Sequence, residues 1–463
     1  MDKKKKFSLT IICTLLVVVL FYNQSVAFNF SLISLITWGI LNFNTKQKRK
    51  DKSYWLLTFI LFLTALSQFI YSDIYSFIAL FFALSAYGLY AQFGKLNFIL
   101  YPVVRFINSV VFLFRILSGE WIPKRKKGSK ILSKLFAWFV MPVLFSIIFL
   151  LIYSTGSELI ADFFKNIKFD FDVKHLSTLI IIGIFFFFNF WSPYIPRFLI
   201  KFNQSLSNDF REHQKEKLKP TYNFLELDLE RKSGEITLVM LNIFLLIFIL
   251  SYNYEQFFMS SSDGNLSAET HERVTTIVFS IIMAIGVILF YFKSTFNFDA
   301  KAKGLKKLTI LWIVLNFLLV LSAITKNTEY ILQFGLTFKR IGVYIFLTLS
   351  IIGLLFSYLK IKNKKTNLYL INRMTWTFFI AFTSCSIINF SWIVTSYNLS
   401  TNKGVESYYL RSFNYNKQVL YDTYKNDPEW MDFFDNERYK QEKTLEKSFL
   451  SHNLYDHYID FGD

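Results

Sequence analysis

Long apolar stretches alternate with short lysine-rich stretches along most of the chain. The apolar stretches are roughly 17 to 23 residues long, the length that a helix needs to cross the hydrocarbon core of a membrane. The shorter alternating segments of a transmembrane β-barrel are not visible. The pattern predicts an all-α, polytopic transmembrane helix bundle of about 11 spans, near residues 7–23, 27–44, 54–70, 74–92, 131–153, 177–200, 236–254, 274–292, 307–325, 341–359 and 374–396.

The positions of the cations predict how these spans are oriented. If Lys3–Lys6 stay in the cytosol, 33 Lys and Arg fall in cytoplasmic segments and 7 in the opposite loops before the tail. This asymmetry favours a cytoplasmic N-terminus and, for an odd number of spans, an extracytoplasmic C-terminus. The first apolar stretch also resembles a signal peptide, with Ala27 as a small residue for cleavage. An Ala-x-Ala site is missing, so a retained helix is favoured.

Composition supports a membrane protein and narrows its partners. Hydrophobic residues make up 53% of the chain and charged residues 18%, whereas soluble domains carry about 25% charge. The formal net charge of +18 lies mostly in loops on one side. It therefore indicates membrane orientation, and nucleic acid is not expected as a partner.

One apolar block, residues 96–118, breaks the alternation. Counting it as a span would place the basic loop 119–134 outside. Arg105, Asn108 and Arg115 recur at helical spacing along one face. We therefore expect an amphipathic helix on the inner membrane surface, with Arg105 and Arg115 near anionic head groups. A re-entrant hairpin or a twelfth span is the alternative.

Changes in polarity divide the chain into four parts. We expect N-terminal transmembrane helices plus the interfacial helix in 1–118, and a middle transmembrane pair with basic inner loops in 119–234. A C-terminal transmembrane bundle follows in 235–396, and a small helical, extracytoplasmic polar tail in 397–463. The tail holds 8 Lys and Arg against 12 Asp and Glu. It is too small for a large core of its own, so it should pack on the outer ends of the spans.

The sequence gives little support for a metal site or a cofactor site. His271 and Glu272 lie just before the span at 274, but a metalloprotease helix would need a second His where Thr275 stands. The pair fits an interfacial acid and base, or simply the start of a solvated helix. Cys13 and Cys385 fall inside apolar spans without partner spacing. We expect no metal and no cofactor.

Lys339 and Arg340 are unusual for their predicted place. They stand on the outer side, at the N-terminal end of the span 341–359. Two cations there oppose the helix macrodipole and the positive-inside preference. Pairing with acidic residues of outer loops or of the tail is one explanation. Holding an anionic ligand, such as a lipid phosphate or a polymer carboxylate, is a second. Extension of the Lys339 side chain to the membrane interface is a third.

The second half of the chain carries polar and small residues in a distinctive order. They are Thr270-His271-Glu272-x-Val274, Asn297-Phe298, Trp312, Asn316, Asn327-x-x-Tyr330-Ile331, Gly335-Leu336-Thr337-Phe338-Lys339-Arg340-Ile341-Gly342-Val343, Ile388-Asn389-Phe390 and Tyr397-Asn398-Leu399. This order resembles the bacterial multi-pass membrane family filed as domain of unknown function 4173, related to 4153, over roughly residues 220 to 415. Arg273 and Phe390 depart from the family pattern. The resemblance implies a bacterial inner-membrane protein with no established reaction.

Resemblance and orientation together predict one polar site facing outward. Its candidate residues are His271, Glu272, Asn327, Tyr330, Thr337, Lys339, Arg340 and Asn398. The leading hypothesis is an envelope scaffold or binding protein, whose partners are the lipid bilayer with an anionic lipid, an envelope polymer or another envelope protein. The second is a membrane-embedded enzyme acting on lipid-linked or anionic substrates, with His271 or Glu272 as acid or base. The third is a transporter or flippase.

Overall fold

The structure is a computed structural model of the 463-residue chain. It describes residues 2–44, 51–119, 138, 141–142, 145–146, 149, 153, 172–212, 220, 226–258, 266–292 and 295–462. Packing divides the chain into two compact units. Unit 1 comprises Met1–Leu96, Leu100–Pro196 and Gln441–His457, and unit 2 comprises Asn97–Ile99, Arg197–Lys440 and Tyr458–Asp463.

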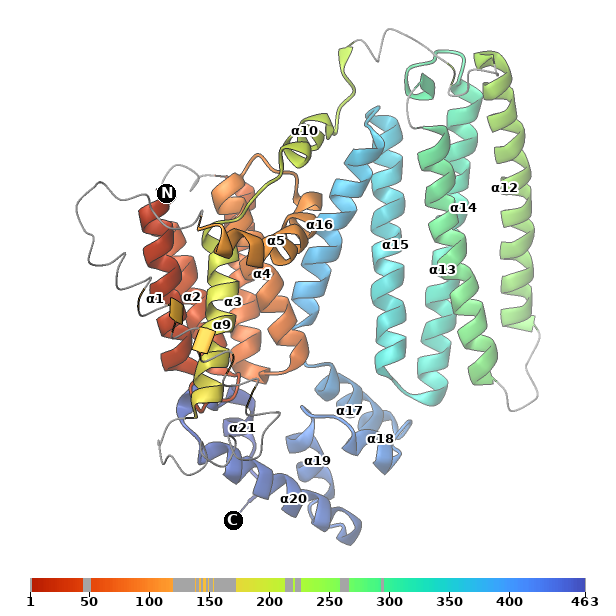
Figure 1. Cartoon of the computed structure of the whole chain (residues 1–463). Helices are drawn as coiled ribbons and strands as arrows, with labels where there is room; N and C mark the ends of the chain where they lie inside the picture. The colour runs from red at the N-terminus through yellow and green to blue at the C-terminus, as the bar shows by residue number, and fades with distance from the viewer. Residues whose placement is uncertain are drawn as a thin grey trace, which may run out of the picture. The chain divides into compact units, whose positions relative to one another are not determined.

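Unit 1 is a helical bundle in which α1 packs along α9 and α3 packs along α4, with α2 beside α3 (Figure 1). Its hydroxyl-bearing side chains mostly bond within their own helix. Thr14 and Thr37, for example, donate to the carbonyl oxygens four residues earlier, which satisfies them in an apolar setting. The helices are α1 (Lys3–Phe21), α2 (Phe28–Asn44), α3 (Lys52–Tyr71), α4 (Ile74–Phe93), α5 (Tyr101–Leu117) and α9 (Val173–Trp191).

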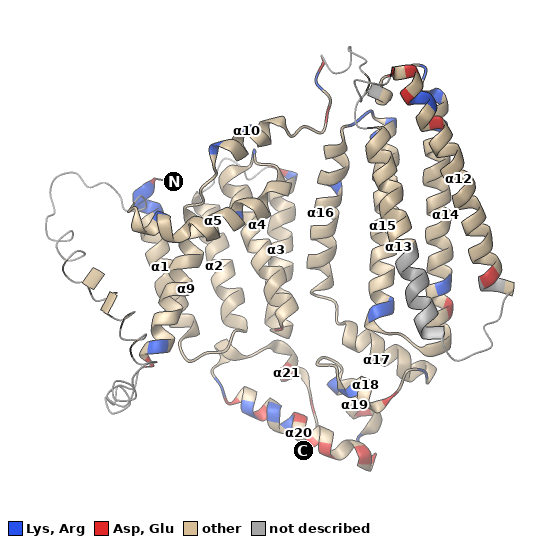
Figure 2. Cartoon of the chain, turned by 45° about the vertical axis from the view of Figure 1, so that its right-hand side comes forward, with Lys and Arg blue, Asp and Glu red and all other residues tan. Residues whose placement is uncertain are grey.

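The helix α5, which η2 (Phe98–Leu100) precedes, covers the block expected to be interfacial. Both views draw it across the ends of α4 and α9 (Figures 1 and 2). Tyr101, Val104, Asn108 and Phe112 form its buried face. By length and composition alone, Phe98–Leu117 could also cross a membrane. The interfacial position therefore stays a prediction.

Unit 2 is built around the long helices α12, α14 and α15, with α13 and α16 packed beside them. Its core contains Leu319, Ala284 and Leu347, and the Trp312 indole donates to the Ala284 carbonyl oxygen across α13 and α14, at 3.3 Å. The elements are α10 (Arg197–Ser205), α12 (Leu227–Phe258), α13 (Leu266–Tyr291), η4 (Thr295–Asn297), α14 (Lys303–Phe334), α15 (Phe338–Lys362), α16 (Asn367–Cys385) and α17 (Phe390–Thr401).

The last apolar segment of unit 2 is broken. The helix α16 ends at Cys385, and α17 begins at Phe390 after a bend of 66°. Asn389 caps the new helix, since its Oδ1 accepts from the Trp392 amide at 2.9 Å, and its Nδ2 donates to the Tyr415 carbonyl oxygen at 2.9 Å. The span expected at 374–396 therefore falls on two helices at an angle, α16 and α17, and is not one straight helix.

The polar tail is helical, as predicted. It comprises α18 (Ser407–Arg411), α19 (Lys417–Tyr424), α20 (Pro428–Leu445), η5 (Phe449–Ser451) and α21 (Leu454–Tyr458). In unit 2 it packs on the turn between α14 and α15, where the rings of Phe338 and Phe413 lie 4.8 Å apart. In unit 1, Ser451 Oγ donates to Gln24 Oε1 at 2.7 Å and accepts from the Ser25 amide at 3.0 Å.

The predicted all-α bundle is confirmed, and the chain is an integral membrane protein. Within the described residues, seven helices are long and apolar enough to cross a membrane, or eight if α16 and α17 count as one span. The spans expected at 7–23, 27–44 and 274–292 correspond to α1, α2 and α13, which fall outside that count. The span expected at 131–153 lies almost wholly outside the described residues. Figure 2 shows the charged residues gathered mainly at helix ends and in the tail.

Candidate functional site

The turn between α14 and α15 carries most of the predicted outer residues. The helix α14 ends at Phe334, and Gly335 follows with φ 82° and ψ 177°, a region of backbone space that essentially only glycine occupies. Thr337 then starts α15, since its Oγ1 accepts from the Arg340 amide at 3.3 Å. The glycine ends one helix and the threonine caps the next, so the turn needs only three residues.

Asn398, on α17, fastens this turn to the tail. Its side chain is 0% exposed. Its Oδ1 accepts from the Leu336 amide at 2.6 Å, and its Nδ2 donates to the Leu336 carbonyl oxygen at 3.0 Å and to the Gly404 carbonyl oxygen at 3.2 Å. Three bonds to buried backbone make Asn398 the link between two segments far apart in sequence.

The two glycines at this contact allow the backbones to approach closely. A Cβ atom on Gly335 would lie 2.6 Å from the Lys403 carbonyl oxygen and 2.8 Å from Asn398 Oδ1. Gly404, with φ 64°, would place a Cβ atom 3.1 Å from the Phe334 carbonyl oxygen. The Lys403 ammonium also donates to the Leu332 carbonyl oxygen. Larger side chains at either glycine would push the tail off the turn.

Arg340 is occupied by its own surroundings. Its guanidinium donates to the Gly335 carbonyl oxygen and lies over the Tyr330 ring, 4.2 Å from the centroid. The buried Asn327 donates from Nδ2 to the Arg340 carbonyl oxygen at 3.2 Å. The structure thus brings Asn327, Tyr330, Thr337 and Arg340 together. Their contacts with one another and with backbone brace the turn from within.

Lys339 differs from its neighbour. Its side chain is exposed at the first turn of α15, and within the described residues no hydrogen bond or ion pair is formed by it. On α14, by contrast, Lys326 forms an ion pair with Glu329 at 3.6 Å. Of the two predicted cations, Lys339 is therefore the one available to a ligand.

The remaining pair of the predicted outer site is defined only by its backbone. His271 and Glu272 lie in α13, and their side chains lie outside the described residues. Their predicted role as acid or base stays a prediction. No group of three or more His, Cys, Asp or Glu in the described part of the chain could hold a metal ion.

In unit 1, the two arginines of α5 turn toward protein groups. Arg105 donates to Ser85 Oγ at 2.7 Å and to the Asn189 carbonyl oxygen at 2.9 Å. Arg115 donates to Asn108 Oδ1 at 2.9 Å and to the Ser192 carbonyl oxygen at 2.6 Å. These bonds satisfy backbone carbonyls where α9 ends before its prolines. The expected contact with lipid head groups stays a prediction.

The sequence interpretation missed a second polar cluster, at the opposite end of α15 in unit 2. Lys360 is 0% exposed, and its Nζ donates to the Phe292 carbonyl oxygen at 2.7 Å. Asp299, which follows Phe292 closely in the chain, accepts at Oδ2 from Arg231 of α12 at 3.1 Å, and both side chains are buried. A cation on the carbonyl end of α13 complements the helix dipole. The only sequence signal was a lysine inside an otherwise apolar helical face.

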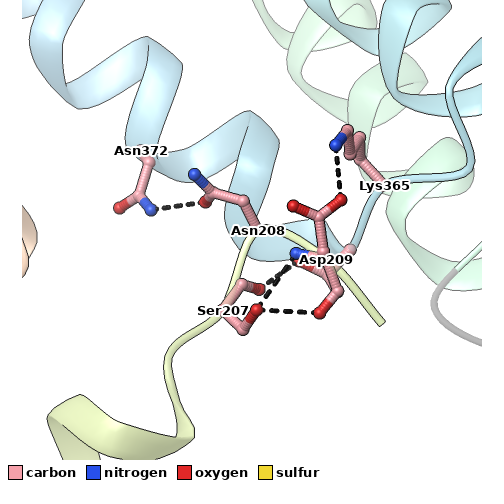
Figure 3. A network of polar contacts seen from close by, with 6 residues as sticks. Ser207, Asn208, Asp209, Lys365 and Asn372 are labelled. Carbon is pink, nitrogen blue, oxygen red and sulfur yellow. Dashed lines mark hydrogen bonds and ion pairs between the residues drawn. The ribbon is translucent and has the colours of Figure 1, made fainter. Parts of the chain in front are cut away.

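The same end of unit 2 holds residues 207–209, which follow α10 and are exposed. Residues Ser207, Asn208 and Asp209 dock onto the beginning of α16 (Figure 3). Asn372 Nδ2 donates to Asn208 Oδ1 at 2.7 Å, and Lys365 forms an ion pair with Asp209. These three residues therefore brace α16.

Comparison with protein families finds a match over most of the chain. The model of the family described as Domain of unknown function (DUF4153) matches residues 11–423, which include the α14–α15 turn, Asn398 and Lys360. No curated protein and no solved structure matches the chain. The matched residues make up most of the 463 in the chain.

Proposed function

We propose that this chain, which belongs to the family described as a domain of unknown function (DUF4153), is a scaffold or binding protein of the bacterial inner membrane. In this proposal the N-terminus is cytoplasmic, and the tail 397–463 and the α14–α15 turn are extracytoplasmic. We also propose that the chain is related to the family filed as domain of unknown function 4173. The outer surface would bind an envelope component that carries phosphate.

The proposal rests on the hydrogen bonds and ring contact that the polar residues at the turn form. Asn398 forms three hydrogen bonds to backbone atoms, and the Arg340 guanidinium is shared between the Gly335 carbonyl and the Tyr330 ring. Residues tied in this way can hold a tail in place. The bonding of Asn398 and Arg340 therefore supports a structural and binding role for the turn.

Lys339 supplies the chemistry of binding. Its ammonium is exposed at the N-terminal end of α15, which is the positive end of the helix dipole. The ammonium and the helix dipole would both stabilise an anion bound there. An ammonium is a compact donor that binds phosphate as a point charge. The proposed ligand is therefore a phosphate group, carried by a lipid or by an envelope polymer.

Native mass spectrometry of the full-length protein tests this role. The protein is released from micelles that contain phosphatidylglycerol or phosphatidylcholine, and retained lipid is counted. For Lys339→Gln we expect about fivefold weaker retention of phosphatidylglycerol, since one lysine near a phosphate contributes about 1 kcal/mol. Lys326→Gln is the matched control, because Lys326 is already paired with Glu329.

Two outcomes would overturn the proposal. Equal loss of phosphatidylglycerol in the two variants would mean that only general surface charge attracts the lipid. Chemical conversion of an added lipid by the wild-type protein, abolished in His271→Ala, would make the protein an enzyme. A soluble polyphosphate, added as a competitor, distinguishes a polymer ligand from a lipid one by displacing the retained lipid.

A further inference from the structure

Two histidines of the tail lie within hydrogen-bonding distance of each other in unit 1. Nδ1 of His452 is 3.0 Å from Nε2 of His457, and the ring centroids are 5.0 Å apart. His452 is half-buried and His457 is exposed. The two nitrogen atoms therefore face each other at a place that solvent can reach.

The turn between the two histidines is fixed by its own hydrogen bonds. Asn453 Oδ1 accepts from the Asp456 amide at 2.7 Å, and Asn453 Nδ2 donates to Asp456 Oδ2 at 2.9 Å. Gln441, on α20, donates from Nε2 to the Asp456 carbonyl oxygen at 2.6 Å. The imidazoles are thus held near each other by the backbone, and their approach does not depend on their own contact.

A third contact fixes the tautomer of His452. Its Nε2 lies 2.8 Å from the Lys447 carbonyl oxygen. A carbonyl only accepts, so this nitrogen carries the hydrogen, and the Nδ1 of the neutral ring has its lone pair directed at His457. Histidines that bind metals commonly donate their second ring N–H to a backbone carbonyl in this way, because the bond orients the ring and raises its basicity.

We propose that His452 Nδ1 and His457 Nε2 form a site for a divalent late first-row cation, Zn²⁺ or Cu²⁺, for which imidazole is a suitable ligand. Zn–N bonds of about 2.0 to 2.1 Å at a tetrahedral angle separate two nitrogens by about 3.3 Å. The two nitrogens need to separate by only a few tenths of an ångström, and both rings rotate so that their lone pairs point at the cation instead of along the line between the nitrogens. Water completes the coordination, and the proton on His457 Nε2 moves to Nδ1 through solvent without any change of oxidation state.

The spacing of the pair explains why the sequence did not reveal it. Metal-binding pairs on helices are read from histidines three or four residues apart, whereas these two are separated by five, with a short turn between them. The simpler interpretation is a hydrogen bond between neutral imidazoles that only stabilises the turn. The two interpretations differ in whether a cation displaces the shared proton.

Isothermal titration of the full-length protein with ZnCl₂ at pH 7.5 tests the site. The protein is held in detergent and carries a histidine-free affinity tag. We expect His452→Ala and His457→Ala each to weaken the tightest binding event at least tenfold. His175→Ala is the matched control, because His175 lies in unit 1 and contacts the Phe21 carbonyl oxygen, with Nε2 at 3.3 Å.

A second pair of variants protects the test against misfolding. His452→Asn and His457→Gln keep hydrogen-bonding groups near the same positions and remove the imidazole ligands. These variants should melt like the wild type without Zn²⁺ and lose the rise in melting temperature that the wild type shows with Zn²⁺. The site would be rejected if the wild type did not bind Zn²⁺, or if a variant that combines His452→Asn with His457→Gln bound it as tightly as the wild type.

Discussion

Asn398 and Leu336 are joined by a two-way hydrogen bond. The Asn398 side chain accepts from the Leu336 amide at 2.6 Å and donates to the Leu336 carbonyl oxygen at 3.0 Å. The amide side chain thus pairs with one residue of the turn as a neighbouring β-strand would. This pairing holds α17 against the α14–α15 turn, and the first prediction follows from it.

Replacing Asn398 by Leu keeps the branched shape of the side chain, although Leu is larger, and removes all three of its hydrogen bonds. The buried backbone groups of Leu336 and the half-buried carbonyl of Gly404 lose their partner, so we expect a loss of about 2 to 4 kcal/mol in the free energy of unfolding. Thermal unfolding of the full-length protein in detergent measures the change. Ser400→Ala, on the same helix and exposed, should leave the melting temperature unchanged. An unaltered Asn398→Leu protein would contradict the link.

Two glycines of the same motif should respond in opposite directions to alanine. At Gly335, with φ 82°, the new Cβ atom would meet the Lys403 carbonyl oxygen at 2.6 Å, so we expect a loss of at least about 2 kcal/mol. At Gly342, inside α15, no atom lies within 4 Å of a Cβ position. Alanine there should be neutral or add up to about 1 kcal/mol. The melting temperatures of the two alanine variants, each compared with the wild type, test this difference. Similar shifts in the two variants would mean that the turn does not constrain Gly335.

Glu437 makes the tail sensitive to acid. Burial alone would raise the pKa of Glu437, but hydrogen bonds from Lys417 and Lys440 and their charges outweigh it, so the pKa lies below its ordinary value. A lowered pKa contributes stability above the unfolded value, near pH 4, which is lost as the pH falls through the folded value. Glu437→Gln should therefore cost about 1 kcal/mol at pH 7, after allowance for solvent screening.

The control for this prediction is to repeat the comparison of the wild type and Glu437→Gln at low pH. At pH 3 the difference in melting temperature between the wild type and Glu437→Gln should be smaller than at pH 7, because the contribution of a carboxylate with a lowered pKa declines below the unfolded value and is lost as the pH falls through the folded value. A difference that persists unchanged at pH 3 would show that Gln disturbs packing and that the charge of Glu437 is not responsible.

Cysteine labelling tests the proposed orientation. In a protein with Cys13→Ala and Cys385→Ala, single cysteines replace Lys339 or Lys362, which are exposed at opposite ends of α15. We expect a membrane-impermeant maleimide to label Lys339→Cys in intact spheroplasts and Lys362→Cys only after permeabilisation. The opposite pattern would place the turn and the tail in the cytosol.

The helices were predictable because apolar length and local capping are encoded over short distances. The end of α9 before Pro193 and the start of α15 beside Thr337 follow from the same local chemistry. The bend before α17 has no Gly or Pro to announce it. Asn398 lies 62 residues from Leu336, so no local pattern could show that they bond.

The sequence indicated which polar residues lie near the α14–α15 turn, but not which groups they contact. Arg340 and Asn398 were selected as polar residues at one end of the spans, and they do lie at one turn. Whether such a side chain points outward or braces a carbonyl depends on its three-dimensional neighbours, such as the Tyr330 ring and Gly335. Lys360 shows the converse, because it lies just past the expected span 341–359, where a lysine ordinarily reaches solvent, and it is fully buried.

The 66° bend between α16 and α17 also determines how the molecule bears mechanical load. Tension applied to the tail beyond Thr401 enters α17 and then divides into two paths. One follows the chain through the bend into α16, and the other crosses Asn398 to the α14–α15 turn. A force applied to the tail would therefore act on the turn beside Lys339 through Asn398, as well as on α16 through the chain.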